Sequence, residues 1–147
     1  MKNSDEVPVK KWAAIYLNED FLNIFTQTHL KTVMVLHINH ANEISPEVKQ
    51  AVGYMQQAGI RLLNQSVLLA GINDSTLAQT ALLKALFELD IQAYYLHQLD
   101  AVAGATHFAV DDETAREIHA EVSARLPGYL VPKLVKEVSG DKAKRPL

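Results

Sequence analysis

Apolar and polar residues follow one another along this chain with two different periods, one typical of strands and one typical of helices. Short apolar runs predict three strands, at 32–38, 60–72 and 91–98. The first run is rich in β-branched residues, which is typical of a strand buried on both faces. Apolar residues three or four positions apart predict helices at 18–30, 45–58, 73–90 and 111–126. The apolar segment 128–138 predicts a last strand.

Residues at the ends of these segments support the boundaries. Ser45 is a favourable N-cap, Pro46 suits the first helical position, and Gly59 is typical of the residue that follows a helix. Asn18 is a comparable cap for the first helix. The order is therefore a helix, three strand–helix units and a terminal strand, which predicts parallel strands joined by right-handed crossovers. Only the first dozen residues and the last eight look loose.

Length and composition narrow the class of protein. A complete eight-unit barrel needs about 250 residues, so a chain of 147 residues fits a smaller α/β sheet. The chain is 48% hydrophobic with a net charge of −3, which gives no general attraction to nucleic acid or anionic lipid. It has no apolar run long enough to span a membrane and no signal peptide, so we expect a soluble cytoplasmic protein. The absence of cysteine excludes disulfides, a cysteine nucleophile and a cluster held by this sequence.

Polar side chains gather where each predicted strand ends. In a parallel α/β sheet this edge is where sites form. The side chains concerned are His37, Asn39, His40, Asn42, Glu43, Asn64, Gln65, Asn73, Asp74, His97, Gln98, Asp100 and His107.

Each candidate has two readings on its residues alone. The spacing of His37 and His40, with Glu43 nearby, suits either a metal or hydrogen bonds at a strand end. Asn64 and Gln65 lie in an apolar run, where an amide either pairs with a neighbouring loop or contacts a ligand.

Two candidates nearer the end of the chain, Asp100 and Lys144, also have an ordinary structural interpretation. Asp100 is either an ordinary turn residue or part of a site, and Lys144 lies in a polar segment typical of a mobile tail. Spacing alone predicts an α/β domain with a polar cleft and names no reaction.

Four ordered blocks resemble a known family. They are "HINHANEI" (37–44), "LLNQSVLLAGIND" (62–74), "YYLHQLDAVAGATHF" (94–108) and "GYLVPKLVKEVSGDKAKRPL" (128–147). They resemble the lysine 2,3-aminomutases, radical S-adenosylmethionine enzymes, and most closely the branch that makes (R)-β-lysine for elongation factor P. The resemblance implies that 18–147 is the C-terminal half of a partial TIM-like (β/α) barrel, with three βα units and a terminal strand. Residues 1–17 are unmatched.

The resemblance also implies roles for individual residues. Lys144 matches the lysine that binds pyridoxal phosphate as a Schiff base. Asp100 and Glu137 match the carboxylates that bind the ammonium group of the substrate lysine. Further residues match positions that line the cofactor pocket: His37, Gln65 and His97. No metal-binding residue is implied in this chain.

This sequence departs from the family in ways that matter for chemistry. Family members use S-adenosylmethionine and a [4Fe–4S] cluster held by a C-x₃-C-x₂-C motif, and this sequence has no cysteine. Ala70 stands where the family usually has arginine, and Glu137 replaces an aspartate.

The expected function is therefore that of the C-terminal part of a lysine 2,3-aminomutase-like isomerase, inactive alone and completed by a separate N-terminal half chain or by a homo-oligomer. Two alternatives stay open. One is a free-standing α/β module that binds pyridoxal phosphate or an amino acid without radical chemistry. The other is a structural or regulatory relic that binds neither.

Overall fold

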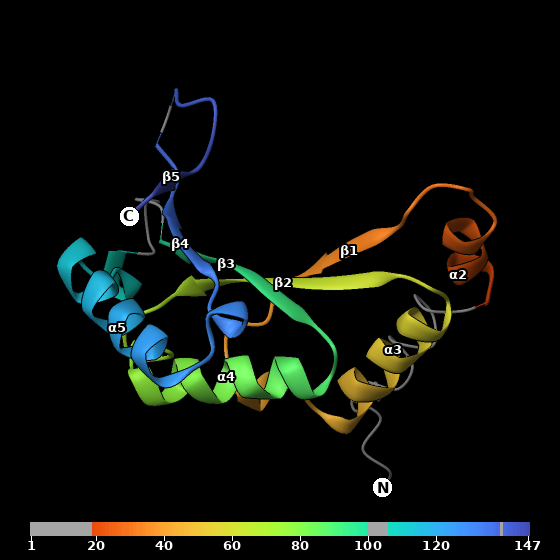
Figure 1. The fold of residues 1–147 in the computed structure, drawn as a ribbon, viewed down its shortest axis with the longest axis horizontal. Coiled ribbons are helices and arrows are strands. Elements are labelled where there is room, and N and C mark those ends of the chain that lie inside the picture. The colour runs from red at the N-terminus through yellow and green to blue at the C-terminus, as the bar shows by residue number, and fades with distance from the viewer. Residues whose placement is uncertain (1–18, 100–105, 139) are drawn as a thin grey trace, which may run out of the picture.

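The computed structural model describes residues 19–99, 106–138 and 140–147, and its elements are labelled in Figure 1. The helices are α2 (Glu19–Thr26), α3 (Pro46–Gln57), α4 (Thr76–Glu88) and α5 (Asp112–Arg125). The strands are β1 (Val33–Leu36), β2 (Arg61–Leu68), β3 (Gln92–Gln98), β4 (Lys133–Lys136) and β5 (Arg145–Pro146). Within these ranges no helix is long and apolar enough to cross a membrane.

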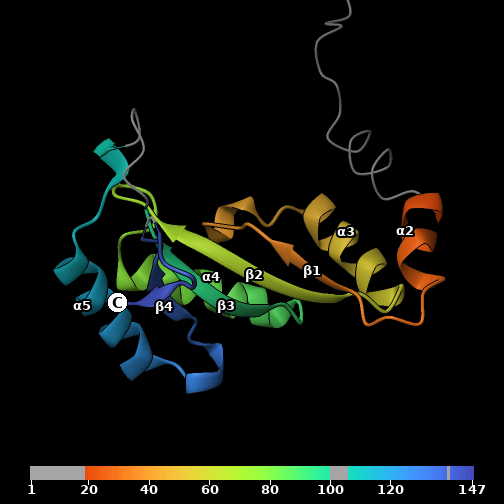
Figure 2. The same ribbon diagram turned by 90° about the horizontal axis from the view of Figure 1, so that it is seen from above.

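The strands form a single sheet in the order β1–β2–β3–β4–β5. The first four strands are parallel, and β5 runs antiparallel to β4. Helices α3, α4 and α5 each connect one parallel strand to the next, and Figure 1 shows α4 and α5 below the sheet. Figure 2 shows α2 beyond the amino end of β1, far from β4. The predicted α/β fold, with three strand–helix units and a terminal strand, is confirmed.

The helices cover one face of the sheet and leave the other open. Along β2, Leu62 and Leu68 are buried under the helices, while Gln65, on the opposite face, is only half-buried. Val33 and Val35 of β1 are 49% and 37% exposed. The prediction that 32–38 is buried on both faces is therefore wrong, because the helices in the described part of the chain pack on one face only.

Two apolar clusters lie between the sheet and the helices. The larger one joins β2 and β3 to all three covering helices, and its most buried members are Val52, Leu62, Leu82, Leu86 and Val122. The smaller one lies nearer the carboxyl ends of the strands and contains Leu68, Leu96, Val110, Ala115 and Leu134. The carboxyl ends of the strands are therefore packed against an apolar cluster of their own.

The helix boundaries follow from local chemistry. The hydroxyl of Ser45 accepts a hydrogen bond from the Val48 N–H at 3.3 Å, Pro46 is the first helical residue, and Gly59 has a φ of +76° just beyond the helix. These three predicted boundaries are confirmed. Helix α2 ends at Thr26, earlier than predicted, and its expected cap Asn18 lies outside the described residues.

A buried asparagine joins the end of β1 to β2. The side-chain oxygen of Asn64 accepts a hydrogen bond from the Ile38 N–H at 2.8 Å, and its nitrogen donates to the Ile38 carbonyl at 3.0 Å. Asn64 is 1% exposed, so these bonds form out of contact with water. Of the two readings of Asn64, pairing with a neighbouring segment is the one that the structure shows.

A second buried asparagine joins the next two loops. The Asn73 oxygen accepts from the Leu69 N–H at 2.7 Å, and its nitrogen donates to the carbonyls of Asn39 and Val67, both at 2.8 Å. In return the Asn39 side chain accepts from the Val67 N–H at 2.8 Å. The segments that follow β1 and β2 are therefore fixed relative to each other by side chains.

The last residues fold back onto the sheet, so the expectation of a loose tail is wrong for those that the structure describes. Val135 lies opposite Pro146 and Lys136 opposite Arg145, and the Leu147 N–H donates to the Leu134 carbonyl at 3.1 Å. Leu147 packs against the smaller apolar cluster, which favours the folded-back position. The predicted strand 128–138 is shorter, at Lys133–Lys136, because Gly128–Leu130 form a 3₁₀ turn.

Replacing Asn64 by alanine leaves the Ile38 N–H and carbonyl buried without partners. Since each such group costs about 1–3 kcal/mol, we expect the free energy of unfolding in urea to fall by roughly 2–4 kcal/mol. Asn42→Ala, at an exposed position, is the control and is expected to change it by less than about 0.5 kcal/mol. Equal effects of the two substitutions would contradict this account.

Candidate functional site

The candidate site lies on the open face of the sheet, towards the carboxyl ends of the parallel strands. Of the six residues to which the sequence resemblance gives a role, five form one continuous line of contacts there: His37, Gln65, His97, Lys144 and Glu137. They come from segments more than 100 residues apart in the chain. The sixth, Asp100, lies outside the described residues.

Gln65 is the central contact of this line. Its Nε2 lies 2.8 Å from Nε2 of His37, and its Oε1 lies 3.3 Å from Nε2 of His97. The Tyr94 hydroxyl donates to the same oxygen at 3.5 Å. With the amide in this orientation, its nitrogen can only donate and its oxygen can only accept. Gln65 therefore links the two imidazole rings, as a donor towards His37 and an acceptor towards His97.

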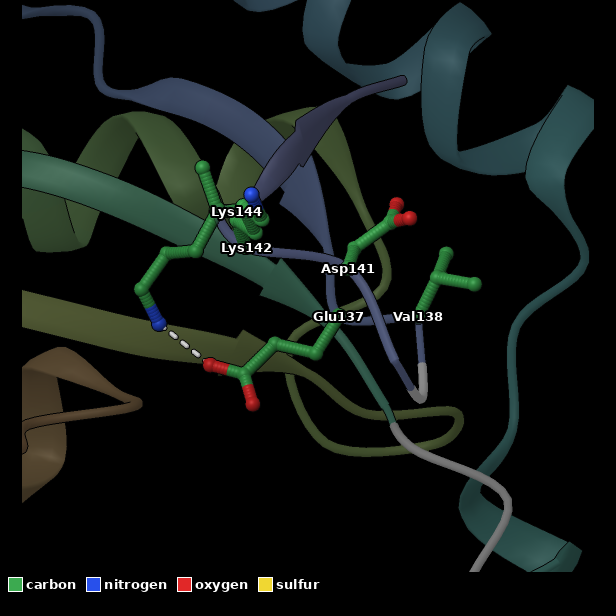
Figure 3. Close-up of a pocket in the computed structure, with 6 residues that line it drawn as sticks. Glu137, Val138, Asp141, Lys142 and Lys144 are labelled. Carbon is green, nitrogen blue, oxygen red and sulfur yellow. Dashed lines mark hydrogen bonds and ion pairs between the residues drawn. The ribbon is translucent and has the colours of Figure 1, made fainter.

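Lys144 meets Glu137 because of the register of the hairpin formed by β4 and β5. The register that places Lys136 opposite Arg145 places Glu137 opposite Lys144 at the next pair. The Lys144 ammonium donates to Oε1 of Glu137, as Figure 3 shows. The Lys144 Nζ also lies 3.5 Å from Nε2 of His97 and 5.5 Å from the centre of the Tyr95 ring.

The ion pair with Lys144 lowers the pKa of the Glu137 carboxyl group. The hydrogen bond from Lys144 and its positive charge hold the pKa of Glu137 below its ordinary value, and the charge of His97 acts in the same direction. The side chains of Lys144 and Glu137 are 30% and 51% exposed. The Glu137 carboxyl is therefore ionised at neutral pH, and both side chains are open to water and to small solutes.

A hollow of about 220 Å³ lies inside the hairpin loop. Figure 3 shows its lining residues, which are Glu137, Val138, Asp141, Lys142, Ala143 and Lys144. Ligand pockets usually measure about 300–1,000 Å³. A ligand of cofactor size therefore needs the open face of the sheet as well as this hollow.

The side chains of His40 and Glu43, two of the possible metal ligands, form hydrogen bonds within their own loop. Nδ1 of His40 accepts from the Asn42 N–H at 3.1 Å, and the Glu43 carboxylate accepts from the N–H groups of Asn39 and His40 at 2.9 and 2.8 Å. These bonds form a capping box at a short 3₁₀ turn. Among the described residues there is no group of three or more histidine, aspartate or glutamate side chains that could bind a metal ion.

Sequence reasoning missed Tyr94 and Tyr95. The pairing of β2 with β3 shifts by one residue between Asn64 and Gln65, so that Ala93 pairs with Asn64 and Tyr95 with Gln65. Tyr94 is the extra residue, and both tyrosine rings lie beside the site, with centres 4.2 Å apart. Strict alternation would place neighbouring residues on opposite faces. The pair of adjacent tyrosines was the available signal, but the shift itself cannot be read from the sequence.

Comparison with known proteins gives the following matches. No family model matches the chain. The chain is 44% identical over 131 residues to L-lysine 2,3-aminomutase of Escherichia coli (strain K12). This match covers 89% of this chain and 38% of that protein. It is 42% identical over 128 residues to L-lysine 2,3-aminomutase of Haemophilus influenzae, covering 87% and 38%. The chain thus spans about two fifths of the length of these curated relatives.

A solved structure resembles the fold. The crystal structure of a radical SAM methyltransferase from Sphaerobacter thermophilus matches 80% of this chain and 37% of that one, with a TM-score of 0.58 and 18% sequence identity. This likeness confirms the predicted fold, part of a TIM-like (β/α) barrel.

The ion pair of Lys144 and Glu137 should be lost in acid. Because the pKa of Glu137 is lower in the folded hairpin than the value of about 4.3 in an unfolded chain, the pair contributes fully above that pH. Its contribution is lost as the pH falls through the lower, folded value. We expect NMR titration of the Glu137 carboxyl carbon to show a higher pKa in Lys144→Met than in the original chain.

Asp111 provides the control for this titration. The backbone and side chain of Thr114 lower the pKa of its carboxyl, independently of Lys144. Its pKa should therefore be the same in both proteins. An unchanged pKa of Glu137 in Lys144→Met would contradict the pairing.

Proposed function

Since this chain belongs to the L-lysine 2,3-aminomutase family over the residues that match its relatives, we propose that it forms the amine-binding part of such an isomerase. The reaction would move the α-amino group of L-lysine to the β-carbon, in the cytoplasm, as part of the modification of elongation factor P. The observation that carries the proposal is the Lys144 amine, which lies at the carboxyl edge of a parallel sheet in contact with Glu137, His97 and Tyr95. A free-standing binding module is not favoured, because 89% of the chain matches an aminomutase.

Two features of the described residues support a site for pyridoxal phosphate. Lys144 offers a partly exposed primary amine, and the rings of His97 and Tyr95 stand edge to face beside it with centres 5.6 Å apart. Bound there, pyridoxal phosphate would supply an aldehyde that joins covalently to amines and withdraws electrons from them. Lys144 would hold the group, His97 and Tyr95 would orient it, and His37 and Gln65 would line the pocket behind it.

Glu137 and Asp100 have the chemistry for binding the substrate. A carboxylate stabilises the ammonium group of a lysine by charge and hydrogen bonding. Glu137 already binds the ammonium of Lys144. We assign the second carboxylate to Asp100 on the family resemblance alone.

The radical-generating chemistry requires residues beyond these 147. The sequence contains no cysteine, so the ligands of a [4Fe–4S] cluster and the main site for S-adenosylmethionine would come from elsewhere in the assembled enzyme. We propose that they belong to a protein segment or partner chain that completes the barrel. Strand β1 is where it would join, because in the described part of the chain β1 pairs with β2 alone and exposes Val33 and Val35.

Covalent capture tests the role of Lys144. We expect pyridoxal phosphate, followed by borohydride reduction and peptide mass mapping, to modify Lys144 in preference to other lysines. Lys144→Ala should reduce total labelling several-fold. Lys142→Ala, which alters the neighbouring lysine of the same hollow, should leave it nearly unchanged. Equal labelling of Lys142 and Lys144 would count against the proposal.

Self-association tests the role of β1. An open strand edge with exposed apolar residues favours pairing with another chain. We expect the isolated chain to associate in analytical ultracentrifugation, and Val35→Lys to reduce that association. Leu77→Lys, at a 77% exposed position on α4, is the control and should have little effect. A strictly monomeric chain would contradict the proposed edge.

A further inference from the structure

A second hollow lies at the edge of the sheet opposite the candidate site, where the parallel strands begin. This space, the amino-edge hollow, lies between residues 25–33 and residues 58–61 and measures about 660 Å³. That volume is within the range of about 300–1,000 Å³ that is usual for ligand pockets. Figures 1 and 2 show this end of the sheet on the side of α2, away from β4 and β5.

The amino-edge hollow is separate from the candidate site. Arg61 lines the hollow and Gln65 belongs to the site, and both lie on β2. Their four-residue separation corresponds to about 13 Å along a strand. No described residue lines both this hollow and the one inside the hairpin loop. A ligand of the amino-edge hollow would therefore not compete with one bound at Lys144.

The charged side chains of the hollow favour an anion. His29, Lys31 and Arg61 line it, and all three are exposed. In the described part of the chain, neither the Lys31 ammonium nor the Arg61 guanidinium forms an ion pair. The described lining residues include no aspartate or glutamate. Positive charge is thus concentrated at this place in a chain whose net charge is −3.

The neighbouring helix ends reduce this positive charge without cancelling it. Helices α2 and α3 both end at this edge of the sheet. The end of a helix is equivalent to about half a negative charge, whereas Lys31 and Arg61 carry two full positive charges. One of the last carbonyls of α2 is also occupied, because the Phe25 carbonyl accepts from the Thr32 hydroxyl at 3.2 Å. The balance at the hollow therefore remains positive.

The hollow also offers neutral hydrogen-bond donors. The Thr28 hydroxyl oxygen accepts from the Leu30 N–H at 3.1 Å, which leaves the hydroxyl proton able to donate. The backbone N–H groups of His29 and Lys31 form no hydrogen bond within the described part of the chain. Donors of this kind add to the two cations in binding the oxygens of an anion.

The remaining wall of the hollow is apolar. Phe25, Leu30 and Ala58 line it, and Phe25 and Ala58 also pack against the larger apolar cluster. This wall is therefore anchored in the core of the protein. A ligand that combines an anionic group with an apolar portion would use both sides of the hollow.

We propose that the amino-edge hollow binds a small organic phosphate. Its phosphate group lies between Lys31 and Arg61, and its apolar portion lies against the wall that contains Phe25. A phosphate monoester carries about −1.5 to −2 charges near neutral pH and has three strong acceptor oxygens, which suits two cations better than a carboxylate does. The planar guanidinium of Arg61 can donate to two of these oxygens at once.

Amide NMR spectra of the full chain, titrated with phenyl phosphate, test this site. We expect the amide signals of His29, Lys31 and Arg61 to shift at lower concentrations than those of Lys142 and Lys144. These last two lysines line the hairpin hollow and provide an internal control for attraction to any basic surface. Shifts confined to the hairpin would overturn the proposal.

Charge-removing variants test the two cations. Because each donates a charge-assisted hydrogen bond from a partly open position, Lys31→Gln and Arg61→Gln should each raise the dissociation constant about five- to tenfold. Lys84→Gln removes the same charge from an exposed position on α4 and should change it less than about twofold. An equal loss in all three variants would overturn the site. If Arg61→Gln disturbs the signals of β2, the loop variant Lys31→Gln decides.

Three further probes separate the parts of the ligand. Benzoate, with one charge, and inorganic phosphate, without an apolar portion, should both bind more weakly than phenyl phosphate, and benzyl alcohol should not bind. Benzoate that binds as tightly as phenyl phosphate would overturn the assignment to phosphate. Inorganic phosphate that binds as tightly would overturn the apolar portion. None of these measurements involves Lys144, so this inference and the proposed function fail separately.

Discussion

The register between neighbouring strands is the constraint on which the candidate site depends. Each contact in the site joins residues from different strands or from the loops that follow them, so a shift of one residue would turn a side chain to the other face. The pairing of β4 with β5 sets Lys144 opposite Glu137, and the pairing of β2 with β3 sets Gln65 near His97. The chemistry of the site is therefore a consequence of backbone pairing.

Buried amides protect this register at the edge where the strands end. Beyond Leu36 the ladder between β1 and β2 stops, and the Asn64 side chain takes over by bonding the backbone of Ile38. His37 is thereby fixed within 2.8 Å of Gln65. Asn73 does the same for the next loop. The strand carries two consecutive amides, Asn64 facing the core for structure and Gln65 facing the open side for the site.

Much of this arrangement could be predicted from the sequence, and the rest depends on contacts between distant residues. Local patterns were sufficient for the three strand–helix units and for the boundaries at Ser45 and Gly59, because caps and apolar periods are encoded within a few residues. The hairpin of the last residues was missed, because it depends on the packing of Leu147 against a cluster built from residues far away. The site tyrosines were missed because a register shift has no local signature.

The same hairpin explains how a residue near the end of the sequence can hold a defined position. Two residues of β5 and the contact of Leu147 fix the base of the hairpin, while the loop between Glu137 and Lys144 contains Gly140 with a φ of +88°. A glycine in this region accepts backbone conformations that other residues avoid. Lys144 lies at the junction of the fixed base and the loop. A lysine in that place presents its amine at the end of a four-carbon side chain, while the backbone register fixes where that side chain begins.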